Sequence, residues 1–554
     1  MGWQNKFNPK KYKVMHFGVH DDKTREYMMN GEALGSTCDQ DFSVHIQRSL
    51  KATGQLDKVV KKAYGYLPLL VEATNNEMSA TENAYEGELQ TPVLTNNVDA
   101  KDVTTVQQDT SLNNGLKAKP KKHVCFPSGG KIVSGSAEPW NPWEAAGSFT
   151  VDEIITSYKL SCEKLGVQPI HKLLTQLQKI TEVHHRIKCL DLKGEKLDYE
   201  GCEALEEIFK RIQFKLINLE WVKLDENGAS ALFDIMEYYD SAVHLNISFT
   251  KHIGSRGWVA AAQLIRKSSS LKDFAACGIS LTEHNARSVA QGLKFNSHLR
   301  VLRLDNASLS GRPLMLLVSA LSVNQMLQEL YLADNKLNSI QDSMYLRELL
   351  QSNCTIRLLD LKNNSIFNTG LEDICEGLRR QKQGLKTLIL WNNRLTHKGM
   401  SHLAAVLPKL TCLETLNLGH NPLSNEGILR LKEALIANRS VIRLGLASTA
   451  ITCEGAVATA EFIVESARIL RLDLRRNRIR TGGLMALSLA LRLNHSLVRL
   501  DLDKEPLGET EEWLIETQKL QLVEILKCCK RNLLTRQTKM EKEKDEEKKP
   551  ASSF

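Results

Sequence analysis

Residues 385–395 read LKTLILWNNRL and residues 413–423 read LETLNLGHNPL, and both fit the pattern L-x-x-L-x-L-x-x-N-x-L. The pattern, complete or degenerate, begins twelve times along the chain, at intervals of 27 to 29 residues. Its first positions are Ile187, Phe214, Ala242, Leu271, Leu299, Leu327, Ile356, Leu385, Leu413, Val441, Ile469 and Leu497. Because no interval is longer than 29 residues, the repeats form one unbroken array.

Each copy predicts one short strand followed by one helix. The alternation L-x-L turns every second side chain of a strand inward, and the Asn that follows can hydrogen-bond the turning backbone. Residues 399–407 (GMSHLAAVL) and 427–437 (GILRLKEALIA) place apolar residues at helical spacing. A single unit cannot bury its own leucines, whereas stacked units share a continuous core. The sequence therefore predicts an α/β solenoid over residues 187–508.

The period of the array is typical of a leucine-rich repeat. A strand and a full helix in 28 or 29 residues resemble the ribonuclease-inhibitor type of repeat. That resemblance implies a curved horseshoe of about twelve repeats, with a parallel sheet inside and helices outside.

The flanks of the array are patterned as caps, because a solenoid otherwise ends in exposed leucines. Thr150 to Glu153 read TVDE, a capping-box sequence that predicts a helix start, and Gly166 predicts its end. A second helix is predicted from Pro169 to Ile180, which makes residues 149–186 an N-terminal helical cap. Residues 509–535 have helical periodicity and predict a C-terminal helix. Residues 536–554, a run of mixed charge, predict a disordered tail.

Composition narrows the class of protein. Among 554 residues, 42% are hydrophobic and 25% are charged, which is enough for a large core. The net charge of +8 is modest and arises largely from short Lys runs outside the repeats, so no nucleic acid is expected as a partner. The twelve cysteines lack paired spacing, and no apolar run is long enough for a membrane span. We therefore expect a cytoplasmic or nuclear protein that is neither secreted nor in a membrane.

No constellation in the sequence predicts catalysis. Ser128 to Lys131 (SGGK) lacks the second glycine, the Ser or Thr and the strand-to-helix context of a phosphate-binding loop. His184, His185 and Cys189 do not recur as paired metal ligands, and a helix-to-strand junction is the favoured interpretation. No nucleophile stands beside a base. We therefore expect no enzyme activity, no cofactor and no metal.

The segment before the caps, residues 116–148, contains a short docking pattern. Lys121 to Phe126 read KKHVCF, in which basic residues precede a V-x-F pair. In an extended chain Val124 and Phe126 point the same way, as a peptide added to a sheet edge requires. Ile132 and Val133 follow after five intervening residues. The alternative is an ordinary buried strand, but the surrounding residues are poorly patterned, which favours a disordered arm.

Longer strings carry a resemblance that gives this arm a partner. From about residue 116 to residue 533 the chain includes KKHVCFPSGGKIVSG, TVDEIITSYK, ASLSGRPLMLL, ELYLADNKLN and LNLGHNP. These strings resemble the leucine-rich-repeat regulatory subunits of protein phosphatase 1. The resemblance implies that the protein binds the phosphatase catalytic subunit and inhibits it. It also implies that Lys122, Val124 and Phe126 dock, with Ile132 and Val133 as a second element. Cys125 departs from the Ser or Thr that often occupies that position.

The first 115 residues follow a different pattern. Residues 1–70, including WQNKFNPKKYKVMHFG and SLKATGQLDKVVKKAYGYL, resemble a fragment of the reverse transcriptase of a non-long-terminal-repeat retrotransposon. The fragment lacks the paired aspartates that hold the metal ions of a polymerase, so it predicts no polymerase chemistry. The alternative interpretation of this segment is an unrelated small basic domain. Residues 71–115 are polar and predict a linker.

A second candidate site lies on the inner face of the predicted sheet. Aspartates recur at the x of L-x-L, and Asp360, Asp473 and Asp501 are the copies proposed as contacts, with Tyr331 and Trp391 as aromatic anchors. One interpretation is a solvated surface, and the other is a face that binds a further protein ligand. At the level of the whole chain, the alternative to a phosphatase regulator is a leucine-rich-repeat scaffold that binds no phosphatase.

Overall fold

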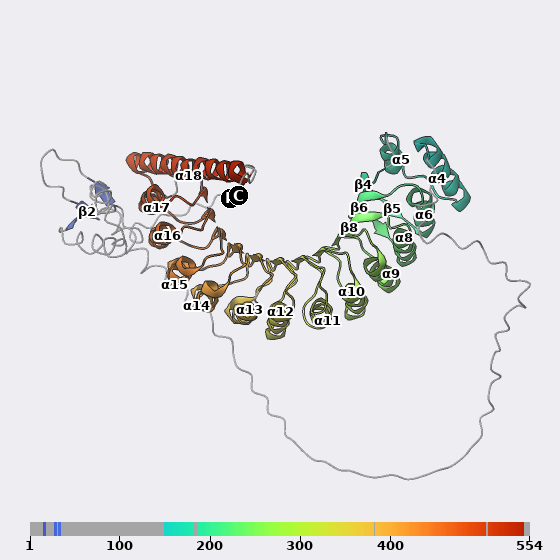
Figure 1. The fold of residues 1–554 in the computed structure, drawn as a ribbon, viewed down its shortest axis with the longest axis horizontal. Helices are drawn as coiled ribbons and strands as arrows, with labels where there is room; N and C mark the ends of the chain where they lie inside the picture. Colours follow the sequence, from blue (N-terminus) through green and yellow to red (C-terminus); the bar gives the residue numbers. More distant parts are fainter. Residues whose placement is uncertain are drawn as a thin grey trace, which may run out of the picture. The chain divides into compact units, whose positions relative to one another are not determined.

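Twelve parallel strands in chain order form the central sheet of the computed structural model. The model describes residues 15–17, 27–29, 32–34, 149–181, 185–381, 383–505 and 508–547. One strand belongs to each of the twelve repeats, and Figure 1 shows the strands on the inner side of the arc with the helices on its outer side. The predicted twelve-repeat solenoid is confirmed.

The strands of this sheet are short. They are β4 (Ile187–Asp191), β6 (Phe214–Asn218), β8 (Ala242–Asn246), β9 (Asp273–Ala275), β10 (Val301–Arg303), β11 (Glu329–Tyr331), β12 (Leu358–Asp360), β13 (Thr387–Ile389), β14 (Thr415–Asn417), β15 (Arg443–Gly445), β16 (Arg471–Asp473) and β17 (Arg499–Asp501). Equivalent positions pair between neighbours, as Leu388 does with Leu416. A separate pair, β5 (Lys196–Leu197) and β7 (Lys223–Leu224), is also parallel.

Helices follow the strands. Between the caps they are α6 (Tyr199–Ala204), α7 (Glu206–Phe209), α8 (Glu226–Tyr238), α9 (Gly254–Lys267), α10 (Glu283–Phe295), α11 (Arg312–Leu321), α12 (Ile340–Ser352), α13 (Phe367–Arg380), α14 (His397–Val406), α15 (Ser424–Ala437), α16 (Cys453–Glu465) and α17 (Thr481–Leu493), with a 3-10 turn, η1, at Leu407–Lys409. The helices predicted at 399–407 and 427–437 are α14 and α15.

The repeat leucines build the core between sheet and helices. Leu388 and Leu390 are 0% exposed, and so are their counterparts Leu416 and Leu418 in the next repeat. On the helix side, Leu403 and Leu431 are also 0% exposed. Burial of each such side chain stabilises the fold by about 1.5 to 3 kcal/mol, because its apolar surface is removed from water. Because the leucines of one repeat contact those of the next, the core runs through the whole array.

The repeat asparagines form a buried ladder at the turn after the strand in five of the twelve repeats, at Asn335, Asn364, Asn393, Asn421 and Asn477. Asn335 accepts hydrogen bonds on Oδ1 from the backbone N–H groups of Ala307 and Leu309, at 2.8 and 3.2 Å. Its own backbone N–H donates to Oδ1 of Asn364 in the next repeat, at 2.7 Å. The predicted role of this Asn in holding the turning backbone is confirmed, and the bonds cross from one repeat to the next.

A second asparagine ladder lies at the ends of the helices. Asn324 donates through Nδ2 to the carbonyl of Leu293 in the preceding repeat, at 2.7 Å. Its Oδ1 accepts from the backbone N–H of Leu327, at 2.9 Å. Asn353 and Asn494 make equivalent bonds to Leu321 and Ile463. These side chains satisfy carbonyls that the last helical turn leaves unpaired.

Two helices close the N-terminal end of the sheet. Helix α4 (Val151–Leu165) begins with the predicted capping box at Thr150 and ends at Gly166, whose φ is 69°. Helix α5 (His171–Leu177) carries Gln176, whose amide donates to the carbonyl of Asp191 and accepts from its N–H, both at 2.8 Å. One side chain thus pairs backbone groups of β4 that a sheet edge would leave open.

Helix α18 (Glu512–Glu547) closes the other end and crosses the last repeats (Figure 1). The predicted helix end at residue 535 and the predicted disordered tail from 536 were wrong for residues 536–547, which continue the helix. The physical reason is composition, because residues 536–547 (RQTKMEKEKDEE) are mostly strong helix formers and contain no Gly or Pro. Opposite charges at helical spacing add small favourable terms.

Near the start of the chain, three strands form a small antiparallel sheet of their own. It contains β1 (Met15–Phe17), β2 (Tyr27–Met29) and β3 (Glu32–Leu34). The rest of the predicted reverse-transcriptase-like segment, residues 1–70, lies outside the described residues, as do the linker at 71–115 and the arm at 116–148.

Candidate functional site

The two candidate sites differ in what the structure describes. Lys122, Val124, Phe126, Ile132 and Val133, the predicted docking residues, lie outside the described residues. The inner face of the sheet is described in full from β4 to β17, and its exposed positions come from the residues on either side of the buried leucines.

In the central repeats the inner face gathers a charged and aromatic cluster. Tyr331 lies in register with Asp360 on the neighbouring strand. The Arg303 guanidinium lies 4.1 Å from the centroid of the Tyr331 ring, a cation–π contact. Arg303 Nε also lies 3.6 Å from Asp273 Oδ1, and the Tyr331 hydroxyl donates to Glu329 Oε2 at 2.8 Å. The sequence-predicted pair of Tyr331 and Asp360 is therefore brought together.

Carboxylates on this part of the face are only partly solvated. Burial raises the pKa of Asp273 above its usual value, although the positive charge of Arg303 opposes the shift. Burial also raises the pKa of Asp305 and of Asp360. Asp305 and Asp360 have no ion pair with a described residue, and each accepts a backbone hydrogen bond, from the N–H of Ala333 and of Lys362 respectively.

Nearer the C-terminal end the inner face is lined by arginines. Arg443, Arg471 and Arg499 occupy equivalent positions on β15, β16 and β17 and stand in register. Asp501 bridges two of them, at 3.0 Å from Arg471 Nη2 to Oδ2 and 2.7 Å from Arg499 Nε to Oδ1. This aspartate is thus already neutralised by its neighbours.

Asp473 is held in a similar way by a residue of its own repeat. Arg475 donates Nη2 to Asp473 Oδ2 at 2.6 Å and Nε to Oδ1 at 2.9 Å, a bidentate pair. Burial disfavours the charged form, but these two hydrogen bonds outweigh it and lower the pKa of Asp473. Asp473 and Asp501 lie on adjacent strands, four and five strands away from Asp360. The predicted aspartates therefore belong to two separate clusters.

Trp391 lies at the end of β13 and stacks on the next repeat. Its ring is parallel to that of His420 within 7°, with centroids 5.8 Å apart. Gly419 permits this contact, because a Cβ at that position would lie 2.3 Å from the Trp391 ring. The half-buried indole is a fixed apolar surface between the carboxylate and arginine clusters of the face.

Sequence reasoning missed Arg303 and the row of Arg443, Arg471 and Arg499. The signal for the row was present in VIRLGL, ILRLDL and LVRLDL, where Arg recurs one residue before the buried Leu. The signal for Arg303 was weaker, since it stands at the x of L-x-L in a single repeat.

Among the residues that the structure describes, no group of His, Cys, Asp and Glu is placed to hold a metal ion. None of the described helices is long and apolar enough to span a membrane.

Comparison with known proteins agrees with the geometry of the repeats. A family model described as "Leucine Rich repeat" matches residues 352–375, 409–432 and 469–488. The chain thus contains leucine-rich repeats, in agreement with the repeating strands and helices of the solenoid. It is also similar to ribonuclease inhibitor of Mus musculus, with 28% identity over 272 residues, 49% of this chain and 59% of the inhibitor. This similarity agrees with the predicted type of repeat.

The same comparison gives nearer relatives. The chain is 61% identical over 299 residues to protein phosphatase 1 regulatory subunit 37 of Bos taurus, and 50% identical over 311 residues to that of Danio rerio. These matches cover 54% and 56% of this chain, but 43% and 33% of the relatives. Over the matched residues the chain is thus similar to these subunits, and it spans less than half of their length.

Proposed function

We propose that this chain is a regulatory subunit that binds the catalytic subunit of protein phosphatase 1 and inhibits it. The observation that carries the proposal is the 61% identity over 299 residues to a protein named protein phosphatase 1 regulatory subunit 37. The names of the relatives describe regulatory subunits, which agrees with the expectation that the chain has no catalytic activity of its own.

Docking is assigned to the arm at residues 121–126. Val124 and Phe126 are two residues apart, so an extended peptide presents both to neighbouring pockets, while its backbone adds to a sheet edge. Lys121 and Lys122 then face an acidic rim of the binding surface on the catalytic subunit. Ile132 and Val133 supply a second apolar contact. The solenoid adds a second binding surface on the same chain, and its inner face is suited to a further protein ligand. Two linked sites bind more tightly than either alone.

A pull-down tests the docking step. Purified phosphatase catalytic subunit should be retained by the immobilised full chain and lost from the variant with Val124→Ala and Phe126→Ala. The matched control is Val103→Ala with Val106→Ala, two apolar truncations in the linker upstream of the arm. Equal retention by the docking variant and the wild type would contradict the proposed site. If the wild type retained no phosphatase, the alternative of a repeat scaffold without phosphatase binding would stand.

A rate measurement tests inhibition separately. The dephosphorylation of a phosphopeptide by the catalytic subunit should slow as the full chain is added, and the docking variant should inhibit only at much higher concentration. An unchanged rate with saturating chain would show binding without inhibition.

A further inference from the structure

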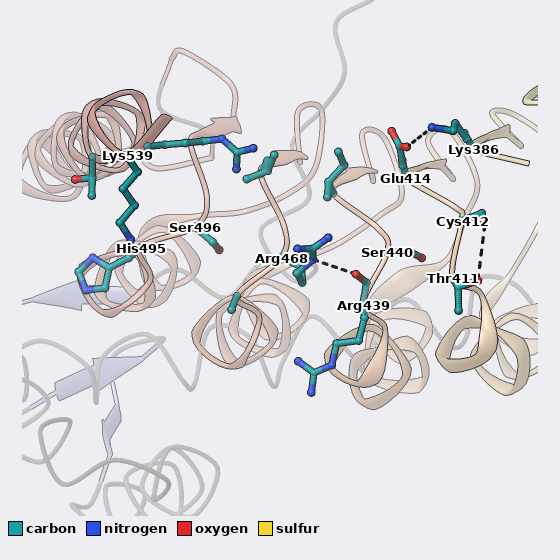
Figure 2. Close-up of a pocket in the computed structure, with 15 residues that line it drawn as sticks. Lys386, Thr411, Cys412, Glu414, Arg439, Ser440, Arg468, His495, Ser496 and Lys539 are labelled. Atoms are coloured by element: carbon teal, nitrogen blue, oxygen red, sulfur yellow. Dashed lines mark hydrogen bonds and ion pairs between the residues drawn. The ribbon is translucent and has the colours of Figure 1, made fainter. Parts of the chain in front are cut away.

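We infer that a basic groove beside helix α18 is a binding site for an acidic peptide segment of a partner protein. The groove has a volume of about 670 Å³. One wall is the second half of α18, and the other is the row of loops that lead into β13 to β17 (Figure 2). It lies outside the inner face and outside the docking arm, so it is a third surface, and its test is independent of phosphatase binding.

Cations dominate the walls. The lining includes Lys386, Arg439, Arg468, Arg536 and Lys539, against one carboxylate, Glu414. That carboxylate is already paired, since Glu414 Oε1 lies 2.9 Å from Lys386 Nζ. The groove therefore carries an excess of positive charge that the lining does not neutralise.

The remaining cations of the groove are positioned to contact a ligand. Arg439, Arg536 and Lys539 are exposed and make no ion pair with a residue in the described part of the chain. Arg468 donates Nε to the backbone carbonyl of Arg439 at 3.0 Å, a bond that orients its guanidinium without cancelling the charge (Figure 2). A fixed guanidinium loses less side-chain entropy when it binds a carboxylate.

The floor of the groove favours a peptide over a nucleic acid. Ile442 and Leu470 are half-buried there, and they offer aliphatic contacts between the cations. No Phe, Tyr or Trp lines the groove, and the imidazole of His495 is its one aromatic ring, so successive bases would find no row of rings on which to stack. Ser440 and Ser496 already donate their hydroxyls to backbone carbonyls of the preceding repeat. Recognition thus rests on charge with aliphatic contacts, which fits an acidic segment that contains aliphatic residues.

The backbone at this edge is already hydrogen-bonded and cannot pair with an added strand in the usual way. The N–H groups of Ile442 and Leu470 donate to carbonyls of the preceding repeat, at 2.9 Å each. A ligand is therefore bound by side chains. The loops before β13 and β17 are four strand spacings apart, roughly 19 Å at about 4.8 Å per strand, which about six residues of extended peptide would span.

Fluorescence anisotropy with a labelled oligo-glutamate peptide tests the site on the full chain. The wild type should bind at low salt and release the peptide as salt rises, because exposed charges are screened. The variant with Arg439→Glu and Arg468→Glu should bind roughly tenfold more weakly or worse. Lys188→Glu with Lys215→Glu, an equal charge change on β4 and β6 at the other end of the sheet, should leave binding unchanged.

A second variant distinguishes loss of the binding site from misfolding. Arg536→Glu with Lys539→Glu changes only exposed positions of α18, so it should melt as the wild type does and still lose the peptide. Equal affinity of this variant and the wild type would overturn the assignment, as would a failure of the wild type to bind. Tighter binding of oligo-uridylate than of the peptide would overturn the class of ligand.

Discussion

Asn393 connects three repeats through its buried side chain and its backbone N–H. Its Oδ1 accepts from the N–H groups of Asn364 and Ile366, at 3.0 and 3.3 Å, and its Nδ2 donates to the carbonyl of Leu361 at 2.8 Å. Its backbone N–H donates to Oδ1 of Asn421 at 2.7 Å. The side chain is 0% exposed, so water cannot replace these bonds. An unpaired buried backbone group costs about 1 to 3 kcal/mol.

Replacing this side chain should therefore be costly. We expect Asn393→Ala to lower the free energy of unfolding by about 2 to 4 kcal/mol, because it leaves two buried N–H groups unpaired and removes one of the two side-chain donors to the carbonyl of Leu361. Urea denaturation followed by circular dichroism measures the change. The exposed control Lys362→Ala should stay within about 0.5 kcal/mol of the wild type. An unchanged midpoint for Asn393→Ala would show that the ladder does not hold the repeats.

The raised pKa of Asp360 gives a prediction with a definite sign. Burial is the largest cause, and nearby Asp305 adds to it. The folded state therefore holds the proton to higher pH than the unfolded state, so the contribution of Asp360 to stability falls as pH rises through its folded pKa. In the wild type the backbone N–H of Lys362 donates to Asp360 Oδ1 at 2.9 Å. Asp360→Asn removes the charge and keeps a side-chain oxygen that can accept this hydrogen bond.

The variant Asp360→Asn should melt higher than the wild type at about pH 7, and this advantage should shrink toward about pH 4. Differential scanning calorimetry at both values measures the two differences. A wild type that melts higher at neutral pH, or a difference independent of pH, would mean that Asp360 is not destabilised by burial.

Residue patterns predicted the first ladder better than the aspartate sites. In the five repeats that have it, the Asn follows the leucines at fixed spacing, so its bonds to the turn could be predicted from sequence. The ion pairs of Asp473 and Asp501 could not, because they depend on which arginine rotamer reaches which carboxylate. The second ladder was also missed, although Asn stands three residues before Leu299, Leu327 and Ile356.

At the scale of elements, the two ends of the solenoid are closed by side chains that imitate the next repeat. Asn532 of α18 donates Nδ2 to the carbonyls of Asn494 and Leu497, both at 3.0 Å. It thus takes the place that the following repeat's asparagine would occupy in the second ladder. Arg531 adds bonds to the carbonyls of Leu491 and Asn494. A helix without repeat pattern can cap the array because it supplies the same donors.

Loss of the Asn532 hydrogen bonds should make the C-terminal end of the solenoid less stable. We expect Asn532→Ala to destabilise the solenoid by about 1 to 3 kcal/mol, since the carbonyl of Leu497 loses its donor and that of Asn494 keeps only Arg531. Gln537→Ala, at an exposed position one turn farther along the same helix, should be nearly neutral. Hydrogen exchange should show faster exchange in α17 and β17 of Asn532→Ala than in the wild type. Equal exchange in the two proteins would place the closing contacts elsewhere.

The boundary of α18 shows where sequence interpretation fails at this scale. Charged residues after 535 were read as solvated and disordered, but charge alone does not break a helix. The residues are strong helix formers and continue a helix that tertiary contacts have already nucleated, so each added residue costs little. The start of α4 was predicted correctly, because a capping box is a local signal.

At the scale of the whole molecule, a repeating core supports three surfaces with different charge. The inner face carries carboxylates in its centre and arginines toward its C-terminal end, and the groove beside α18 is basic. The core needs only the leucine spacing, so the surface positions are free to differ between repeats. This freedom explains why sequence predicted the architecture well and the surfaces poorly. The docking arm was predicted from a resemblance, and it lies outside the described residues.

The affinity of the full chain for the phosphatase catalytic subunit tests the central claim most directly. Isothermal titration calorimetry with the wild type should give saturable binding, and the variant with Val124→Ala and Phe126→Ala should bind more weakly by about 2 to 5 kcal/mol, because two apolar anchors are lost. The melting temperatures of the two proteins should be equal, since neither residue belongs to a repeat. Equal affinities, or no binding by the wild type, would contradict the account.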